Sequence, residues 1–140
     1  MKEIEVLIPH RAPFLYVDKL ISLSKEEIIG TKVFTDLDQF LKGSFPDFNY
    51  VPGVILIEAL AQCGGAGIKK LGLADGLFGL ANIENANFFK GVAYETEFKM
   101  VIRNIKIADK FIKQTGIGYS ENERCVEMTW TCIKFQVNTR

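Results

Sequence analysis

The pattern of apolar and polar positions is most distinctive over residues 54–66, which are almost all apolar or small. Only Glu58 and Gln62 interrupt this run. A segment that is apolar all round is typical of a helix enclosed on every side. Pro52 suits a first helical turn because its missing N–H has no intrahelical partner there, and Gly72 suits a C-terminal cap. The pattern therefore predicts a long buried helix between Pro52 and Gly72.

Elsewhere apolar residues tend to recur at every second position, which is typical of antiparallel strands with one face in solvent. The alternation is clearest where Phe98, Met100 and Ile102 share one face. Residues 36–40 are expected to form a brief helical turn with Asp36 as its cap. The predicted strands are Val17–Leu23, Ile28–Thr35, Leu77–Ala81, Asn82–Lys90, Glu95–Ile107, Phe111–Tyr119 and Arg124–Val137.

Together these elements predict an α+β architecture, in which one long central helix is wrapped by a curved antiparallel sheet. Such a sheet would hide the whole circumference of the helix, which explains its apolar sequence. Gly64, Gly65 and Gly67 lower helix propensity, so their presence indicates close backbone approach to a strand or to a second subunit's helix. We expect residues 1–140 to form a single domain, because this length suffices for one core.

Glu58 and Gln62 are the two exceptions within the predicted helix. They are four residues apart and therefore lie on the same helix face. A buried carboxylate is unfavourable unless it is paired, hydrogen-bonded or protonated. We therefore predict that Glu58 is a functional carboxyl, while the alternative is a structural carboxyl paired with Gln62 or with a partner's arginine.

Charge and composition exclude several classes of function. Seventeen basic and seventeen acidic residues cancel, so no global field favours nucleic acid or anionic lipid. The odd number of cysteines without CxxC spacing favours buried free thiols over a metal or redox site: Cys63, Cys125 and Cys132. The N-terminus lacks the apolar stretch of a signal peptide, and the long apolar run is too short for a membrane span. We expect a cytoplasmic protein.

Three stretches of the chain resemble one known family. Residues 43–62, GSFPDFNYVPGVILIEALAQ, resemble the signature of the β-hydroxyacyl-ACP dehydratases of fatty-acid synthesis, the FabZ type. That signature reads G-H-F-P, then P-G-V-[apolar]3-E-A-[apolar]-A-Q. Residues 8–20, IPHRAPFLYVDKL, resemble the family's opening segment, and residues 77–92 resemble its I-x-x-x-x-F-x-x-x-V stretch. The resemblance implies the hotdog fold, usually paired into dimers.

The resemblance also implies a reaction and its residues. The family removes water from a 3-hydroxyacyl chain carried on the phosphopantetheine of acyl carrier protein (ACP), and it needs no metal or other cofactor. Glu58 matches the family's helix glutamate, the acid that a partner subunit supplies. Gly53 and Val54 match the backbone N–H donors that hold the thioester carbonyl, and Gln62 matches the pattern's glutamine. Phe45 and Phe88 are candidate linings of an acyl tunnel.

The main departure from the family concerns its catalytic histidine, whose position is Ser44 here. A serine hydroxyl does not titrate near neutral pH and is a poor general base. The chain's single histidine, His10, matches the P-H-R of the opening segment. We interpret it as a loop histidine hydrogen-bonded to backbone, rather than as a relocated base. Residues 93–95, Ala-Tyr-Glu, also replace the family's usual Pro-Gly-Asp.

These residues leave three hypotheses of function. The first is a dehydratase-like lyase acting on an acyl-ACP, with its activity reduced or lost. The second is a non-catalytic acyl-thioester binder, or a subunit whose Glu58 completes a heterodimer with a histidine-bearing hotdog protein. The third is a thioesterase in which Glu58 activates water. Otherwise we expect a homodimer or a higher oligomer.

Overall fold

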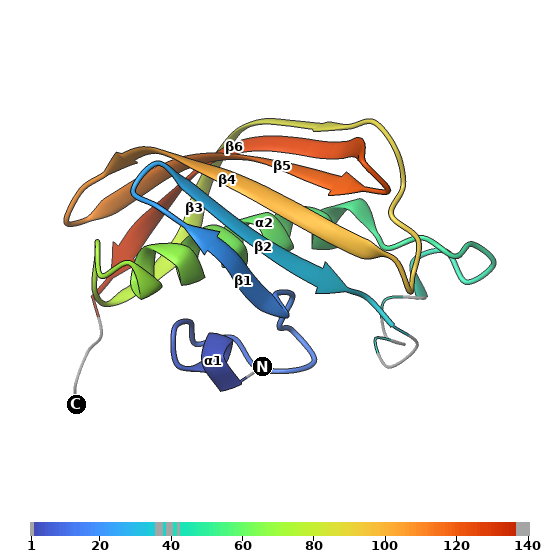
Figure 1. The fold of residues 1–140 in the computed structure, drawn as a ribbon, viewed down its shortest axis with the longest axis horizontal. Coiled ribbons are helices and arrows are strands. Elements are labelled where there is room, and N and C mark those ends of the chain that lie inside the picture. The colour runs from blue at the N-terminus through green and yellow to red at the C-terminus, as the bar shows by residue number, and fades with distance from the viewer. Residues whose placement is uncertain (1, 36–37, 39–40, 42, 137–140) are drawn as a thin grey trace.

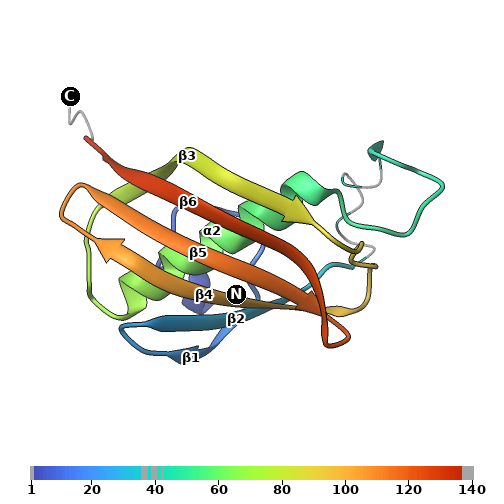
Figure 2. The same cartoon turned by 90° about the horizontal axis from the view of Figure 1, so that it is seen from above.

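A computed structural model describes residues 2–35, 38, 41 and 43–136 of the chain. In chain order the elements are α1 (Lys2–Glu5), β1 (Lys19–Leu23), β2 (Glu27–Val33), α2 (Gly53–Lys70), β3 (Leu77–Phe88), β4 (Glu97–Ile107), β5 (Phe111–Ser120) and β6 (Glu123–Phe135). The six strands form one sheet in the order β1-β2-β4-β5-β6-β3, with every neighbouring pair antiparallel (Figure 2).

The long helix α2 lies against the inner face of this curved sheet (Figure 1). The alternating residues of β4 that were expected to share a face, Phe98, Met100 and Ile102, are fully buried beneath it. Trp130 of β6 is buried in the same core. The predicted α+β architecture, a central helix wrapped by an antiparallel sheet, is therefore confirmed.

The two ends of α2 follow the sequence signals. Pro52 has an extended conformation with φ of −55° and ψ of 136°, and Gly53 is the first helical residue. At the other end Leu71 is the C-cap, and Gly72 follows it with φ of +68°. That left-handed conformation favours glycine, so Gly72 ends the helix one residue beyond its cap.

Two of the three helix glycines allow the close approach that the sequence predicted. A Cβ on Gly64 would lie 2.2 Å from Oε1 of Gln114 on β5, and one on Gly67 would lie 2.5 Å from Ile28 on β2. Neither distance is compatible with a side chain unless its neighbour moves. Gly65 differs, since a Cβ there would meet only Ile8 at 3.9 Å.

Two sequence predictions need correction or fall outside the described residues. Residues 77–81 and 82–90 form one strand, β3, because its pairing with β6 continues through two register shifts. These irregularities hid the continuity of the strand from the alternation pattern. Most of the helical turn predicted for residues 36–40 lies outside the described residues.

The expectation that the sheet hides the whole circumference of α2 is wrong at its first turn. Val54 is 70% exposed, so the sheet does not cover its side chain. The edge strand β3 is also open to solvent, with Leu80, Ile83 and Phe88 all exposed. The single chain therefore leaves apolar surface uncovered at the start of α2 and along β3.

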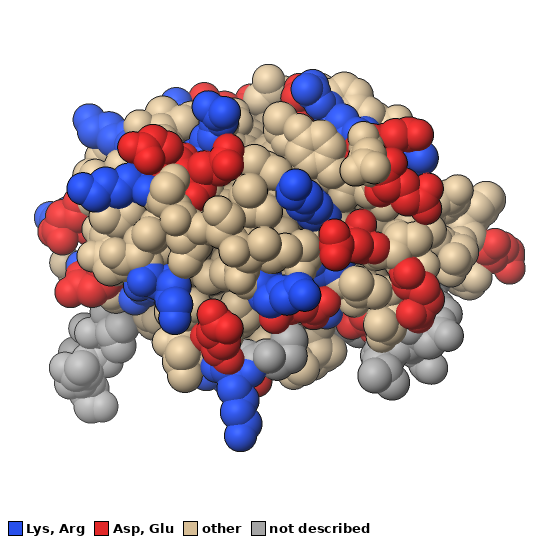
Figure 3. All heavy atoms as spheres, in the orientation of Figure 1, with Lys and Arg blue, Asp and Glu red and all other residues tan. Residues whose placement is uncertain are grey.

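The rest of the surface has no dominant sign of charge in the view of Figure 3, where basic and acidic side chains are interspersed. This agrees with the equal numbers of basic and acidic residues. In the part of the chain that the structure describes, no helix combines the length and apolarity that crossing a bilayer requires.

Candidate active site

Glu58 lies in the second turn of α2 and is held by Gln62, one turn further along the same helix. The Nε2 of Gln62 donates a hydrogen bond of 3.0 Å to Oε2 of Glu58. Gln62 is itself fixed, because its Oε1 accepts the Tyr16 backbone N–H at 2.8 Å and its Nε2 lies 3.3 Å from the Phe14 carbonyl oxygen. The predicted pairing of Glu58 with Gln62 is thus present, and it ties α2 to the N-terminal segment.

His10 is the residue whose place the sequence did not predict. Its Nε2 lies 3.5 Å from Oε2 of Glu58, and its ring stacks on Phe14 with 6.3 Å between ring centroids. Its Nδ1 is buried and has no hydrogen-bond partner among the described residues. His10 therefore lies in a loop as expected, but the structure shows no hydrogen bond from its ring to backbone among the described residues. Two features of the sequence could have drawn attention to His10: it is the only histidine of the chain, and it lies in the P-H-R segment.

The side chains of Glu58, Gln62 and His10 face one mostly apolar cavity of about 120 Å³. Its wall combines residues 7–10 of the N-terminal segment, the face of α2 that carries Glu58 and Gln62, and residues 76–80 at the start of β3. Gln114 and Cys132 of the sheet close the remaining side. A cavity with few polar groups in an apolar wall is typical of a small-molecule site.

The other titratable groups near Glu58 stay protonated at neutral pH. Burial, and after it the charge of Glu58, raises the pKa of the Cys132 thiol to about 11. The same two causes, with a contribution from Asp38, raise the pKa of Tyr16 to about 12. Because the thiolate is the nucleophilic form of cysteine, Cys132 is not an active nucleophile in this cavity. Glu58 and His10 are thus the candidates for proton transfer there.

The loop that carries Ser44 lies apart from this cavity. Ser44 is exposed, and its backbone N–H bonds the Leu41 carbonyl oxygen at 3.3 Å. The neighbouring Phe45 is 65% exposed, so it does not line the cavity either. Within this chain the loop and Glu58 do not form one site.

The start of α2 is also separate from the cavity wall. Gly53 lies against the ring of Phe88, so close that a Cβ on Gly53 would be 2.8 Å from that ring. Neither Val54 nor Phe88 is part of the wall, and Phe88 is half exposed. The helix start keeps unsatisfied backbone donors and the positive end of the dipole, the two features that suit an oxyanion.

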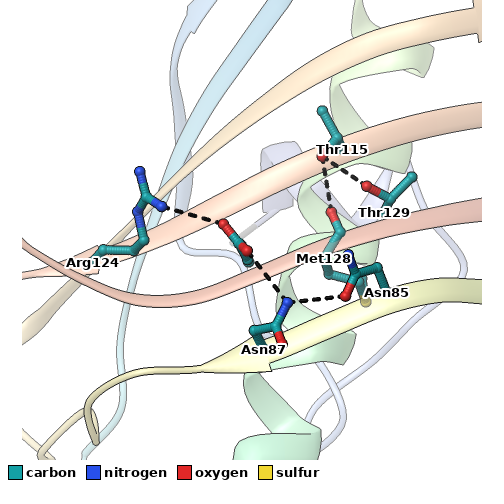
Figure 4. Close-up of polar contacts among 7 residues, drawn as sticks. Asn85, Asn87, Thr115, Arg124, Met128 and Thr129 are labelled. Carbon is teal, nitrogen blue, oxygen red and sulfur yellow. Dashed lines mark hydrogen bonds and ion pairs between the residues drawn. The ribbon is translucent and has the colours of Figure 1, made fainter.

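A second hollow lies on the outer face of the sheet, among polar side chains of β3, β5 and β6 (Figure 4). Thr115 approaches the Thr129 hydroxyl at 3.0 Å, and Asn87 donates to Asn85 at 2.9 Å. These groups mainly bond one another, and the hollow holds no group placed for chemistry. Within the described residues no cluster of three or more His, Cys, Asp or Glu side chains is arranged to bind a metal ion.

Comparison with known proteins adds relatives to this geometry. Residues 8–128 match the model of the FabA-like domain. The chain is 40% identical over 117 residues to the 3-hydroxyacyl-[acyl-carrier-protein] dehydratase FabZ of Xanthomonas campestris, an alignment covering 75% of this chain and 76% of that protein.

Solved structures share the fold at low sequence identity. The dehydratase heterocomplex ApeI:P from Xenorhabdus doucetiae superposes with a TM-score of 0.80 at 18% identity, covering 95% of this chain and 91% of that chain. A hypothetical thioesterase with coenzyme A from Streptococcus pneumoniae superposes with a TM-score of 0.66 at 12% identity, covering 95% and 94%. At these identities the likeness concerns the fold, and it agrees with the hotdog architecture.

Proposed function

Because the chain belongs to the FabA-like family, we propose that it is a dehydratase-like lyase acting on a 3-hydroxyacyl thioester carried by ACP in the cytoplasm. The observation that carries this proposal is the Glu58 carboxyl, held by Gln62 in the wall of a mostly apolar cavity. The reaction requires no metal or other cofactor, since proton transfer and stabilisation of the thioester oxygen suffice.

In the proposed reaction, a base removes a proton from C2 and Glu58 protonates the C3 hydroxyl. The hydroxyl leaves as water, and the electron pair of the C2–H bond becomes the new C2–C3 double bond. The N–H groups of Gly53 and Val54 at the start of α2 stabilise the charge on the thioester oxygen. Gln62 keeps Glu58 oriented. The exposed rings of Phe45 and Phe88 contact the acyl chain or its linker outside the cavity.

Ser44 is proposed to stand where the family carries its catalytic histidine. Since a serine hydroxyl does not titrate near neutral pH, we expect dehydration to be slow or lost. A positioned acid–base group contributes about 10²–10⁴ in rate, so its absence reduces activity without removing substrate binding.

We propose that the site is shared between two chains. Leu80, Ile83 and Phe88 of β3 form an exposed apolar edge. Val54, in the first turn of α2, is exposed as well. Unpaired strand edges readily pair with another chain. Ile83→Lys should therefore convert a homodimer to monomer by sedimentation, while Ile105→Lys, an exposed isoleucine of β4, should not. A wild-type monomer at micromolar concentration would contradict the proposal.

A heterodimer is the alternative arrangement. A partner that brings the histidine would complete the site with Glu58 of this chain, and the structural relative ApeI:P is a dehydratase heterocomplex. Titrating the chain with a histidine-bearing relative should then raise activity to a plateau at equal subunit numbers. Glu58→Gln in this chain should remove that gain.

The decisive experiment measures the reverse reaction, hydration of a crotonyl thioester, by the purified protein. We expect slow hydration that Glu58→Gln removes, with Glu127→Gln on the outer sheet face as the matched control. Release of free thiol without 3-hydroxyacyl product would identify the thioesterase alternative. Binding of the acyl thioester without either product, alone or with a histidine-bearing partner, would identify a non-catalytic binder.

A further inference from the structure

The Glu58 carboxylate is approached on one oxygen by two nitrogen-bearing side chains. Nε2 of Gln62 lies 3.0 Å and Nε2 of His10 lies 3.5 Å from the same atom, Oε2. We propose that His10 is a positioning residue for Glu58, which directs an Nε2–H group at Oε2 and leaves Oε1 for the substrate. The effect of His10 on catalysis rests on the proposed function, whereas the contact between His10 and Glu58 does not.

The surroundings of His10 assign the position of its proton. Nδ1 is buried without a hydrogen-bond partner among the described residues, so a proton on Nδ1 would be an unsatisfied buried donor. Nε2 faces a carboxylate oxygen, which is an acceptor. The neutral imidazole with its proton on Nε2 satisfies both conditions. In this form His10 directs its N–H toward Oε2, which lies 3.5 Å from Nε2, and it has no lone pair on the nitrogen that faces the site.

The second donor at Oε2 is oriented by the backbone. The Oε1 of Gln62 accepts the Tyr16 N–H, so the amide cannot turn and its Nε2 must point toward Glu58. With both donors on Oε2, the other carboxylate oxygen has no hydrogen-bond partner among the residues that the structure describes. Oε1 of Glu58 is therefore the oxygen available to exchange a proton with a molecule in the cavity.

The segment around His10 holds the imidazole in place. The ring stacks on Phe14 with an interplanar angle of 20°. The guanidinium of Arg11 donates to the carbonyl oxygens of Ile8 at 3.0 Å and of His10 at 2.7 Å, which fixes the backbone on both sides of the ring. The side chain of His10 is 28% exposed, so only part of the ring reaches solvent. Such support is what a positioning residue requires.

The contact can be tested without any enzyme assay, because His10 is the only histidine in the chain. In protein labelled with ¹⁵N-histidine, the two ring nitrogens give unambiguous signals. For the neutral form of the ring we expect a protonated Nε2 and an unprotonated Nδ1, and a shift of the Nε2 signal in Glu58→Ala but not in Glu127→Ala. A protonated Nδ1, or an Nε2 signal that ignores Glu58→Ala, would overturn the assignment.

Kinetics then test the positioning role. His10→Ala should lower kcat for crotonyl-thioester hydration about tenfold or more with little change in KM, because a misplaced catalytic group slows the reacting step. His10→Gln should recover most of kcat, since its amide nitrogen replaces Nε2 as a donor. Val6→Ala, an exposed residue of the same segment, is the control.

Each kinetic outcome decides between two roles for His10. If His10→Gln is as slow as His10→Ala while both variants remain folded by circular dichroism, the imidazole itself transfers a proton and the positioning role is wrong. Unchanged kcat in His10→Ala would also overturn it. If the wild-type chain has no hydratase or dehydratase activity, either alone or with a histidine-bearing partner, the proposed function fails, and the ring-nitrogen signals alone decide whether His10 donates to Glu58.

Discussion

Two regions that the proposed reaction needs are built to different degrees within one chain. Around Glu58 the carboxyl, the Gln62 amide and the Tyr16 N–H are linked by hydrogen bonds, and His10 completes the group. Around Ser44 the loop is exposed and offers aromatic side chains to solvent. The first region is held together within the chain alone, whereas the second exposes apolar side chains, which supports the proposal that it meets a second chain.

The difference indicates which parts of the proposed site can be changed separately. A substitution at Glu58 or Gln62 breaks a buried network, so it changes both stability and chemistry. A substitution at Ser44 meets no packing constraint within this chain, because the residue is exposed. The exposed region can therefore lose or regain a catalytic group while the fold remains intact.

The largest effect should come from restoring a base in the exposed region. Ser44→His should raise the dehydration rate by about 10²–10⁴, the contribution of a positioned acid–base group. The measurement is the rate of hydration of a crotonyl thioester at pH 7. Ser44→Ala is the control and should change the rate little.

The same Ser44→His variant can also contradict the proposal that the exposed loop and Glu58 act in one site. If Ser44→His folds, forms the same oligomer and keeps Glu58, yet shows no gain, then the loop does not approach Glu58 of a partner. The two regions would then belong to different sites.

The next effect should come from the enclosed region. Gln62→Leu removes a hydrogen-bond partner from the buried Tyr16 N–H and from Glu58, so we expect it to lower the free energy of unfolding by about 2–6 kcal/mol, at roughly 1–3 kcal/mol for each of the two groups. Urea denaturation measures this loss. Lys70→Leu, at an exposed position of the same helix, should change stability by less than about 0.5 kcal/mol. Equal stability of both variants would show that the network is dispensable.

The sequence predicted the enclosed region better than the exposed one, and the reason is physical. Periodicity reports burial, so it located α2, the face shared by Glu58 and Gln62, and the inward side of β4. It could not place His10, because the contact with Glu58 depends on how an irregular N-terminal segment packs across α2. It also split β3, because an exposed edge strand with register shifts has little alternation. Enclosure of the first turn of α2 was overestimated, since periodicity cannot tell an intrachain neighbour from a partner.

A third prediction tests the burial of the Cys63 thiol, which lies on α2, through the pH dependence of stability. Burial raises the pKa of Cys63 to about 12 from 9.0, so above pH 9 the unfolded chain loses this proton while the folded chain keeps it. This stabilisation is complete below pH 9 and is lost as pH rises toward 12. We expect Cys63 to lower the free energy of unfolding by roughly 2–3 kcal/mol between pH 9 and 11, at about 1.4 kcal/mol per unit.

Cys63→Ala is the matched variant for this titration and should flatten the alkaline decline. Part of the decline should remain, because the pKa of buried Tyr16 is also raised, to about 12. An unchanged slope in Cys63→Ala would mean that the thiol reaches solvent.

The smallest effect should lie beyond both regions, at the far end of α2. Gly72→Ala should lower the free energy of unfolding by about 1 kcal/mol, because φ of +68° is unfavourable for a residue with a Cβ. Gly43→Ala should be nearly neutral, since no atom lies within 4 Å of its added Cβ and its φ is not positive. The thermal unfolding midpoints of both variants measure this difference. A loss of stability at Gly43 equal to that at Gly72 would contradict the prediction.

The strand order has a consequence for how this protein folds. β3 follows α2 near the middle of the chain and pairs with β6, the last strand, so that Leu77 meets Phe135. The neighbouring hairpin β5–β6 closes locally, whereas the β3–β6 ladder must wait for a long loop to close. Residues 76–80 at the start of β3 also form one wall of the cavity beside Glu58. The cavity and the exposed edge should therefore form together, and later than the local β5–β6 hairpin.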